Sequence, residues 1–279
     1  MNGDRFLSVL KSKIFKIMPV TLTLALYKAM MRVHSYRHNP TGGPVSVSLK
    51  ETSVLVSDRD YTLALPSFRN VPRFRRGMAR QLERLARKYG ADTFFTPKSG
   101  DVVLDVGANI GEFSIYCAAK GAGIVAFEPD PVVYKCLTQN LARFQNVSAL
   151  PVALWHERTT QRFYSAFDSS DSSLIKPDEV IHSFFDVDCQ PLDEIPMLAE
   201  FQHIDFLKMD GEGAEPEILS GAKETLRRIR RAAIDVGPER HGKDTKEEVG
   251  VIFREHGFRI LDESPEHVLF AENMGWKTK

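Results

Sequence analysis

The sequence predicts an α/β fold of the Rossmann-like kind, built on a mostly parallel sheet with a reversed final strand. From about residue 100 onward, short buried-type strands alternate with amphipathic helices, which is the pattern of a parallel sheet covered by helices. The first strand runs into a glycine-containing turn, "DVGANIG". The last two strands are separated only by "DESPE". Five residues are too few for a parallel crossover, so these two strands must be antiparallel.

The composition fits a soluble globular protein with an extension. The chain has 279 residues, of which 43% are hydrophobic and 27% charged. We expect an N-terminal extension of basic helices and a short β-meander over residues 1–95, followed by one domain over residues 96–279. The net charge is zero, but residues 1–40 carry seven Lys or Arg against one Asp. Three cysteines without metal-ligand spacing indicate reduced, buried thiols.

The N-terminal region is both basic and apolar. Its uncharged run, residues 17–27, is shorter than the ~20 residues that a membrane-spanning helix needs. Residues 5–33 could lie as a basic amphipathic segment on an anionic membrane surface, or pack on the rest of the protein or on a second subunit. We expect a cytoplasmic protein, and the sequence leaves peripheral membrane contact and homo-oligomer formation open.

The elements follow in order along the chain. Alternating apolar residues over 45–65 predict two or three short antiparallel strands. Met78, Leu82, Leu85 and Tyr89 predict a helix that ends at Gly90, and its Arg-rich opposite face is interpreted as solvated. Further strands are predicted at 101–107, 123–129, 147–155, 203–210, 232–237, 258–261 and 267–271. Further helices are predicted at 111–121, 131–144, 216–229 and 244–256.

The ends of the first two strands of the main domain predict a cofactor site. Gly107 and Gly111 let the backbone approach a ligand closely, and Glu128 ends the second strand, where a carboxylate can accept hydrogen bonds from ribose hydroxyls. The third glycine of a dinucleotide site is missing, and no G-K-[ST] follows. S-adenosylmethionine has no phosphate, and its cationic end would suit Asp105. The predicted cofactor contacts are Asp105, Gly107, Ala108, Asn109, Gly111, Glu128, Pro129 and Ala153.

Several motifs occur in the order found in one known family. "LDVGANIGEFS", "VAFEPDP", "PLDEI", "DFLKMDGEGAEPEILSGA" and "AAIDVGPE" resemble the FkbM-type S-adenosylmethionine-dependent methyltransferases over about residues 100–240. The resemblance implies a class I methyltransferase fold. It also implies methyl transfer to a hydroxyl of a sugar, a glycolipid or surface polysaccharide, or a polyketide-type product. Asp235 and Gly211 depart from the family pattern, which has glutamate and an apolar residue there more often.

The acidic stretch "FLKMDGEGAEPEIL" supplies the candidate catalytic residues. Asp210 and Glu212 follow the fourth strand, beside the expected cofactor, and His241 follows the fifth. One of these side chains could act as the general base that takes the acceptor proton. As an alternative, Asp210, Glu212 and Asp235 are hard oxygen ligands that could converge on Mg²⁺.

Other interpretations stay open beside these. Glu215 and Glu217 are interpreted mainly as first-turn helix residues that the helix dipole favours. The insertion at 156–185 could hydrogen-bond sugar hydroxyls or form a flexible loop. The basic stretch 69–88 raises ribose methylation of a nucleic acid as an alternative, although we expect no nucleic-acid partner. A non-catalytic S-adenosylmethionine-binding module is the other alternative.

Overall fold

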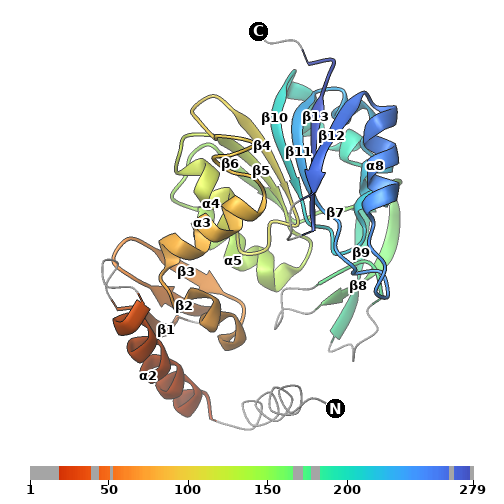
Figure 1. Cartoon of the computed structure of the whole chain (residues 1–279). Coiled ribbons are helices and arrows are strands. Elements are labelled where there is room, and N and C mark those ends of the chain that lie inside the picture. Colours follow the sequence, from red (N-terminus) through yellow and green to blue (C-terminus); the bar gives the residue numbers. More distant parts are fainter. Residues whose placement is uncertain are drawn as a thin grey trace. The chain divides into compact units, whose positions relative to one another are not determined.

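The computed structural model describes residues 19–38, 44–50, 53–165, 172–176, 183–263 and 267–276. These residues form two units, the first ending at Arg80 and the second starting at Gln81 (Figure 1). The first part of the predicted membrane-surface segment, residues 5–18, lies outside the described residues. None of the described helices combines the length and the apolar character that crossing a bilayer requires.

The first unit contains one long helix, a three-stranded antiparallel sheet and a 3₁₀ helix. Its elements are α2 (Val20–His38), β1 (Ser46–Lys50), β2 (Ser53–Ser57), β3 (Thr62–Leu65) and η1 (Phe68–Phe74). The strands pair in the order β1-β2-β3, which confirms the predicted meander. Tyr27 and Met31 form the buried face of α2, and the ring of Tyr27 stacks on Phe68 with 5.4 Å between centroids.

The second unit is built on a seven-stranded sheet in the order β12-β13-β11-β10-β4-β5-β6. These strands are β4 (Val102–Val106), β5 (Gly123–Phe127), β6 (Val147–Leu150), β10 (Ile204–Met209), β11 (Ile229–Asp235), β12 (Phe258–Glu263) and β13 (Val268–Asn273). The five strands from β11 to β6 are parallel, whereas β13 is antiparallel to both of its neighbours. The predicted reversed strand is therefore confirmed.

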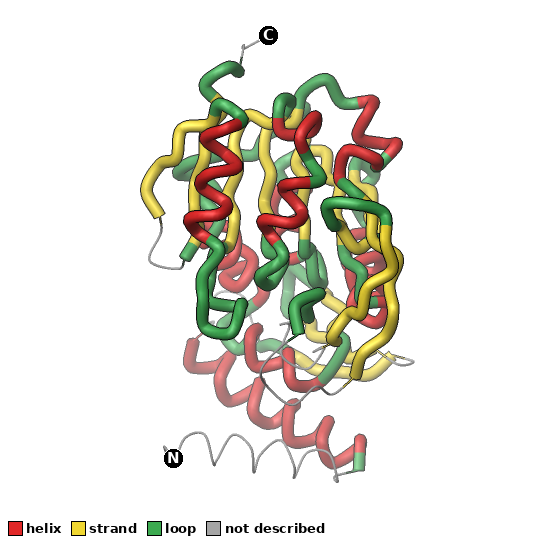
Figure 2. Tube along the Cα trace, turned by 90° about the vertical axis from the view of Figure 1, so that its right-hand side faces the viewer, coloured by secondary structure: helices red, strands yellow, loops and turns green. Residues whose placement is uncertain are grey.

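Helices lie on both faces of this sheet (Figure 2). They are α3 (Met78–Lys88), α4 (Glu112–Ala118), α5 (Pro131–Leu141), α6 (Glu215–Ser220), α7 (Lys223–Leu226) and α8 (Lys246–Glu255), with the 3₁₀ helices η2 (Leu192–Glu194) and η3 (Pro196–Glu200). The strands are buried between them, so they read as nearly continuous apolar runs. Because the strand order reverses beside β4, the ends of β4, β5, β10 and β11 meet at the edge where ligands bind in such folds.

Two predicted elements are divided in the structure. The helix predicted over 216–229 is broken into α6 and α7 at Gly221, and Ile229 starts β11. A Cβ atom on Gly221 would lie 2.4 Å from the Trp155 carbonyl oxygen, so the chain passes too close there for a side chain. The strand predicted over 147–155 is divided at Pro151, which has no N–H for a sheet.

The insertion after the third parallel strand contains regular structure in its described residues. Its described residues form an antiparallel pair, β8 (Thr159–Ser165) with β9 (Ser183–Gln190). The short strand β7 (Ala153–Leu154) joins β9 in parallel and completes a separate three-stranded sheet. The serine hydroxyl of Ser165 donates to Asp130, and the hydroxyl of Ser173 donates to the Glu212 carbonyl oxygen at 2.7 Å. Both contacts tie the insertion to the ligand-binding edge.

Candidate active site

The loop between β4 and α4 is shaped by glycines and by one left-handed asparagine. Gly107 and Gly111 have φ values of 68° and 90°, and Asn109 has 52°. A Cβ atom on Gly107 would lie 1.9 Å from the carbonyl oxygen of Asp210, so only glycine fits where β4 and β10 end side by side. The Asn109 side chain accepts the N–H of Ile110 at 2.8 Å and holds the turn. The loop is thus a fixed backbone surface at the ends of the strands.

Glu128 connects this loop to the end of β5. Its carboxylate accepts the backbone N–H groups of Asn109 at 3.0 Å and Asp130 at 2.9 Å. Burial raises the pKa of Glu128 to about 7, although both backbone hydrogen bonds favour its ionised form. Each carboxylate oxygen has a second lone-pair direction, so the group can still accept ribose hydroxyls from a bound nucleoside. The position fits the cofactor role that the sequence predicts.

Asp105 lies near the end of β4, as expected, and has a charged partner within the protein. It is fully buried, its Oδ2 accepts the Ser114 hydroxyl at 2.6 Å, and the Lys208 ammonium lies 3.0 Å from Oδ1. Lys208 also donates to the carbonyl oxygens of Val106 and Gly107, at 3.1 and 2.7 Å. Asp105 therefore has a cationic partner within the protein, and this buried ion pair fixes the first residues of the loop. The expected contact between Asp105 and the cofactor's cationic end stays a prediction.

The remaining predicted cofactor residues lie in two places. Ala108 is buried in the loop, and its N–H donates to the Phe127 carbonyl oxygen at 2.9 Å. Pro129 is half-buried beside Glu128, just before Asp130, whose side chain caps α5. Ala153 is buried on β7, in the separate three-stranded sheet. The structure thus brings Ala108, Asn109 and Glu128 together, while a cofactor contact of Ala153 stays a prediction.

A second polar cluster lies at the ends of β10 and β11. The hydroxyl of Tyr89 donates to Oδ2 of Asp210 at 2.6 Å and reaches Oδ2 of Asp235 at 3.5 Å. The Lys88 ammonium contacts the same Asp235 oxygen at 2.5 Å. Asp210 is half-buried, and its N–H donates to the Val106 carbonyl oxygen at 3.1 Å, beside the cofactor loop. Two carboxylates, one hydroxyl and one ammonium therefore converge at the predicted acceptor side.

The pKa values of Asp235, Lys88 and Tyr89 are all raised in this cluster. Burial, followed by the negative charge of Asp210, raises the pKa of Asp235, against the lowering effect of Lys88. Burial lowers the pKa of Lys88, but Asp210 and Asp235 outweigh it and leave that pKa raised. Burial and the same two carboxylates raise the pKa of Tyr89 well above its usual value, so its hydroxyl stays protonated and donates. Lys88 is accordingly a cation at neutral pH.

The other predicted catalytic residues, Glu212 and His241, lie on the loops that follow β10 and β11. Glu212 has a φ of 51°, and its carbonyl oxygen accepts Ser173 as described above. His241 is exposed, with a φ of 52°, in a turn closed by hydrogen bonds between Arg240 and Lys243. Catalytic roles for Glu212 and His241 therefore stay predictions. Within the described ranges, no group of three or more His, Cys, Asp or Glu side chains is arranged to hold a metal ion, so Mg²⁺ at Asp210, Glu212 and Asp235 has no support.

Glu239 is a carboxylate that the sequence interpretation left out. It follows β11 and is half-buried, and its Oε2 atom is buried without a hydrogen-bond partner among the described residues. Burial raises its pKa, and the charges of Asp235 and Asp210 raise it further. Carboxylates with raised pKa values cluster at functional sites, so Glu239 joins Asp210 and Asp235 as a candidate residue of the acceptor side.

Glu215 does more than stabilise the first turn of α6. Its side chain is buried and its Oε1 accepts the N–H groups of Gly211 at 2.9 Å and Gly213 at 3.1 Å. The Thr245 hydroxyl donates to its other oxygen at 3.2 Å. Burial raises the pKa of Glu215 to about 8. The carboxyl group therefore shapes the loop after β10, which carries Glu212.

Glu215→Gln is expected to make stability less dependent on pH. The unfolded chain loses this proton near pH 4.5, whereas the native protein keeps it to about pH 8. Native protein binds more protons between these values, so the free energy of unfolding falls as pH rises. Between pH 5 and 8 the variant should lose less stability than the wild type, by no more than about 4 kcal/mol. Urea unfolding at both pH values measures this, with the exposed Glu224→Gln as control. Equal pH dependence in Glu215→Gln and wild type would contradict it.

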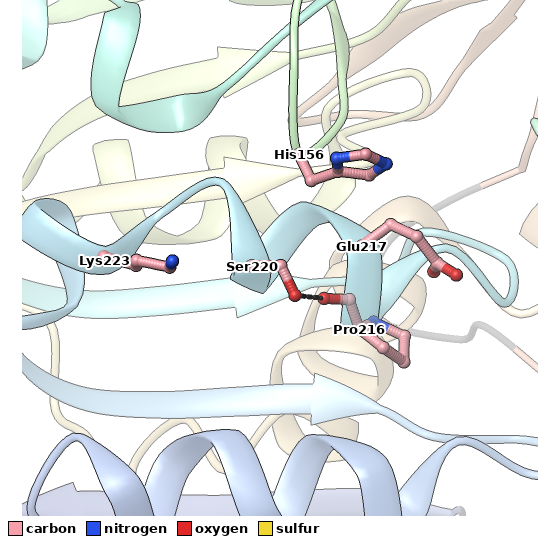
Figure 3. Close-up of a pocket in the computed structure, with 5 residues that line it drawn as sticks. All are labelled: His156, Pro216, Glu217, Ser220 and Lys223. Atoms are coloured by element: carbon pink, nitrogen blue, oxygen red, sulfur yellow. Dashed lines mark hydrogen bonds between the residues drawn. The ribbon is translucent and has the colours of Figure 1, made fainter.

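A separate pocket of about 390 Å³ lies along α6 (Figure 3). It is lined by His156, Pro216, Glu217, Ser220 and Lys223. The Ser220 hydroxyl donates back to the Pro216 carbonyl oxygen at 2.8 Å, and Glu217 forms an ion pair with Arg240. Ser220 and Glu217 thus already have partners within the protein. The lining contains none of the carboxylates at the ends of β5, β10 and β11.

The family of the chain follows from a comparison with family models. Residues 105–260 match the model of the methyltransferase FkbM domain, from the end of β4 to β12. The chain belongs to this family. The match contains the cofactor loop, Glu128 and both carboxylates that contact Tyr89. The chain therefore contains an S-adenosylmethionine-dependent methyltransferase domain, and the strand order is that of a class I methyltransferase fold.

Curated relatives are similar at low identity. The chain is 28% identical over 249 residues to the 31-O-demethyl-FK506 methyltransferase FkbM of Streptomyces tacrolimicus, covering 75% of this chain and 92% of that protein. It is 30% identical to methyltransferase sdnD of Sordaria araneosa, covering 45% and 62%. It is 26% identical to the hexuronic acid methyltransferase AglP of Haloferax volcanii, covering 49% and 56%. The chain spans less than two thirds of the last two proteins.

Solved structures are similar at lower identity still. The magnesium protoporphyrin IX methyltransferase ChlM of Synechocystis PCC 6803, with bound SAM, is 14% identical, with a TM-score of 0.43 over 74% of this chain and 84% of that chain. The fold assignment rests on the strand order and on the family, and not on this likeness.

Glu128→Ala is expected to weaken binding of S-adenosylhomocysteine by about 10- to 100-fold, as the loss of hydrogen bonds to a charged group predicts. The change also leaves the N–H groups of Asn109 and Asp130 without their acceptor, so we expect a stability loss of about 1–3 kcal/mol. Calorimetric titration and urea unfolding measure the two effects, with the exposed Glu157→Ala as control. Unchanged affinity in the folded variant would remove Glu128 from the cofactor site.

Proposed function

We propose that this protein transfers the methyl group of S-adenosylmethionine to a hydroxyl oxygen of a sugar or another small-molecule acceptor. The observation that carries the proposal is the position of Asp210. Its carboxylate stands half-buried at the end of β10, and its backbone is in contact with the loop that begins at Gly107. A carboxylate next to the cofactor loop can remove a proton from an acceptor hydroxyl.

Asp210, Tyr89 and Glu128 have separate roles in the proposed reaction. Bound S-adenosylmethionine supplies a methyl group whose bond to sulfur breaks as the acceptor oxygen bonds to its carbon, with the electron pair left on sulfur. Asp210 takes the hydroxyl proton through Oδ1, because Oδ2 accepts the Tyr89 hydroxyl. Glu128 and the backbone of residues 107–111 hold the nucleoside end. Tyr89 keeps the Asp210 carboxylate in one orientation during the proton transfer.

The acceptor class draws on the relatives. The name of one relative describes methylation of a hydroxyl of FK506, and that of another names hexuronic acid. These names support hydroxylated small molecules and sugars, free or linked to a lipid, as acceptors for this chain. The two described anchors of the insertion, Ser165 and Ser173, would place β8 and β9 beside the acceptor.

The test is an acceptor screen with methyl-labelled S-adenosylmethionine. The acceptors are methyl glycosides, methyl glucuronide, a polyprenyl-linked sugar, a hydroxylated macrolide and, for the ribose alternative, unmodified RNA. Mild base hydrolyses methyl esters but not methyl ethers, so base-stable label on a sugar or macrolide is the expected result. Label found only on RNA, or only as a base-labile ester, would overturn the proposal. Asp210→Asn serves as the catalytically impaired control.

A further inference from the structure

Lys88 forms an ion pair with one of the acceptor-side carboxylates, although its sequence context is that of a solvated basic helix. It ends α3, and its ammonium lies 2.5 Å from Oδ2 of Asp235. The two side chains are only 19% and 9% exposed, in contrast to the exposed Arg87 beside it. A partly buried contact of this kind is worth more than a surface ion pair, because less water screens it.

The surroundings of Lys88 explain why a positive charge is needed there. Asp210 and Glu212 follow β10, Asp235 is the last residue of β11, and Glu239 follows it, so four carboxyl groups lie at the ends of two neighbouring strands. Asp210, Asp235 and Glu212 all act on Lys88 through their charges. Tyr89, which follows α3, donates to Asp210. From β10, the Lys208 ammonium lies 5.2 Å from the centre of the Tyr89 ring but forms its ion pair with Asp105.

The Tyr89 hydroxyl shows how close the two aspartates are. It lies 2.6 Å from Oδ2 of Asp210 and 3.5 Å from Oδ2 of Asp235. Two carboxylates that share such a site tend to retain one proton between them, because both cannot ionise without strong repulsion. A proton retained on Asp210 would leave that carboxyl group unable to take one from an acceptor. A positive charge beside Asp235 reduces the repulsion between the two aspartates, so that both carboxyl groups can be ionised.

We propose that Lys88 is a positioning residue for methyl transfer, which keeps Asp235 charged and fixed so that Asp210 can take the acceptor proton. This inference rests on the proposed function, in which the proton from the acceptor oxygen ends on Asp210. Lys88 itself neither gains nor loses a proton in the step. Its side chain provides, within the protein, the positive charge that the carboxylates of this edge require.

The first test needs no acceptor. The full-length protein carrying ¹³C-labelled aspartate carboxyl groups is titrated by NMR in the wild type, Lys88→Met and Lys88→Arg, with Arg87→Met as the matched control on the same helix turn. We expect the Asp235 carboxyl to titrate at least about one pH unit higher in Lys88→Met. The other two variants should stay close to the wild type. An unchanged titration in a folded Lys88→Met protein would overturn the proposal.

The second test uses the acceptor found in the screen. Lys88→Met should lower kcat by about 10- to 100-fold and move the acid limb of the kcat/KM profile to higher pH. Binding of S-adenosylhomocysteine should stay within about twofold, and Lys88→Arg should restore the acid limb. Loss of kcat without movement of the limb would mean a merely structural role. If no acceptor is methylated, the proposed function fails, and the NMR titration still decides whether Lys88 controls the Asp235 charge.

Discussion

Asp210→Asn is expected to lower methyl transfer by about 10²- to 10⁴-fold, the usual contribution of a general base, while binding of S-adenosylhomocysteine stays within about twofold. The amide has the size of the carboxylate and can still accept the Tyr89 hydroxyl, but it cannot take a proton. The Asp210 N–H, which donates to the Val106 carbonyl oxygen, is unaffected by the change. The cofactor loop should therefore keep its shape. Turnover with labelled S-adenosylmethionine and calorimetric titration give the two quantities.

The control for this prediction is Asp60→Asn, which removes the same charge from an exposed position in the first unit. It should leave both quantities unchanged. A wild-type rate in Asp210→Asn would place the proton acceptor elsewhere, with Glu239 as the next candidate because its carboxyl is half-buried with an unpartnered oxygen among the described residues. A rate loss accompanied by an equal loss of cofactor affinity would instead indicate a displaced loop.

The central sheet and the cofactor loop could be predicted because their signals are local. Apolar runs of strand length, the glycines of the first turn and an acidic residue at the next strand end each lie within a few residues of one another. Gly107, Gly111 and Glu128 are accordingly found where the sequence places them. The reversed strand also follows from a local fact, the length of the connection between two strands.

The partners of the acceptor-side residues could not be predicted, because they join distant parts of the chain. Tyr89 lies 121 residues before Asp210, and its spacing fits an apolar helix face equally well. Lys88 lies 147 residues before Asp235, at the end of an Arg-rich helix that reads as solvated. Only the packing of α3 beside the sheet turns these two side chains to the carboxylates. The domain boundary expected at residue 95 assigns Lys88 and Tyr89 to the extension, separate from the domain that contains the two aspartates.

Asp105 and Lys208 show a further limit of local reasoning. A carboxylate at a strand end, before a glycine turn, is equally suited to a cationic ligand and to a buried lysine. A signal for the second was present, since Lys208 interrupts the apolar run "FLKM" and a lysine inside a buried strand needs a charged partner. The register produces the ion pair, because Lys208 lies opposite Asp105 in the parallel pair of β10 and β4.

Gly107→Ala is expected to destabilise the protein by about 3 kcal/mol or more, because strain at a left-handed residue is joined by a collision. The added Cβ would lie 1.9 Å from the Asp210 carbonyl oxygen, so the ends of β4 and β10 would have to separate. That separation moves the cofactor loop away from Asp210, and we expect binding of S-adenosylhomocysteine to be lost as well.

Gly100→Ala is the matched control for Gly107→Ala. Gly100 also has a positive φ, 88°, but no atom lies within 4 Å of a Cβ built there. The control should cost only the strain of the left-handed conformation, about 1–2 kcal/mol, and should leave binding intact. Urea unfolding of both variants and calorimetric titration separate the two contributions. Equal losses in both variants would mean that the left-handed strain alone explains the effect, and that β4 and β10 can separate without cost to the site.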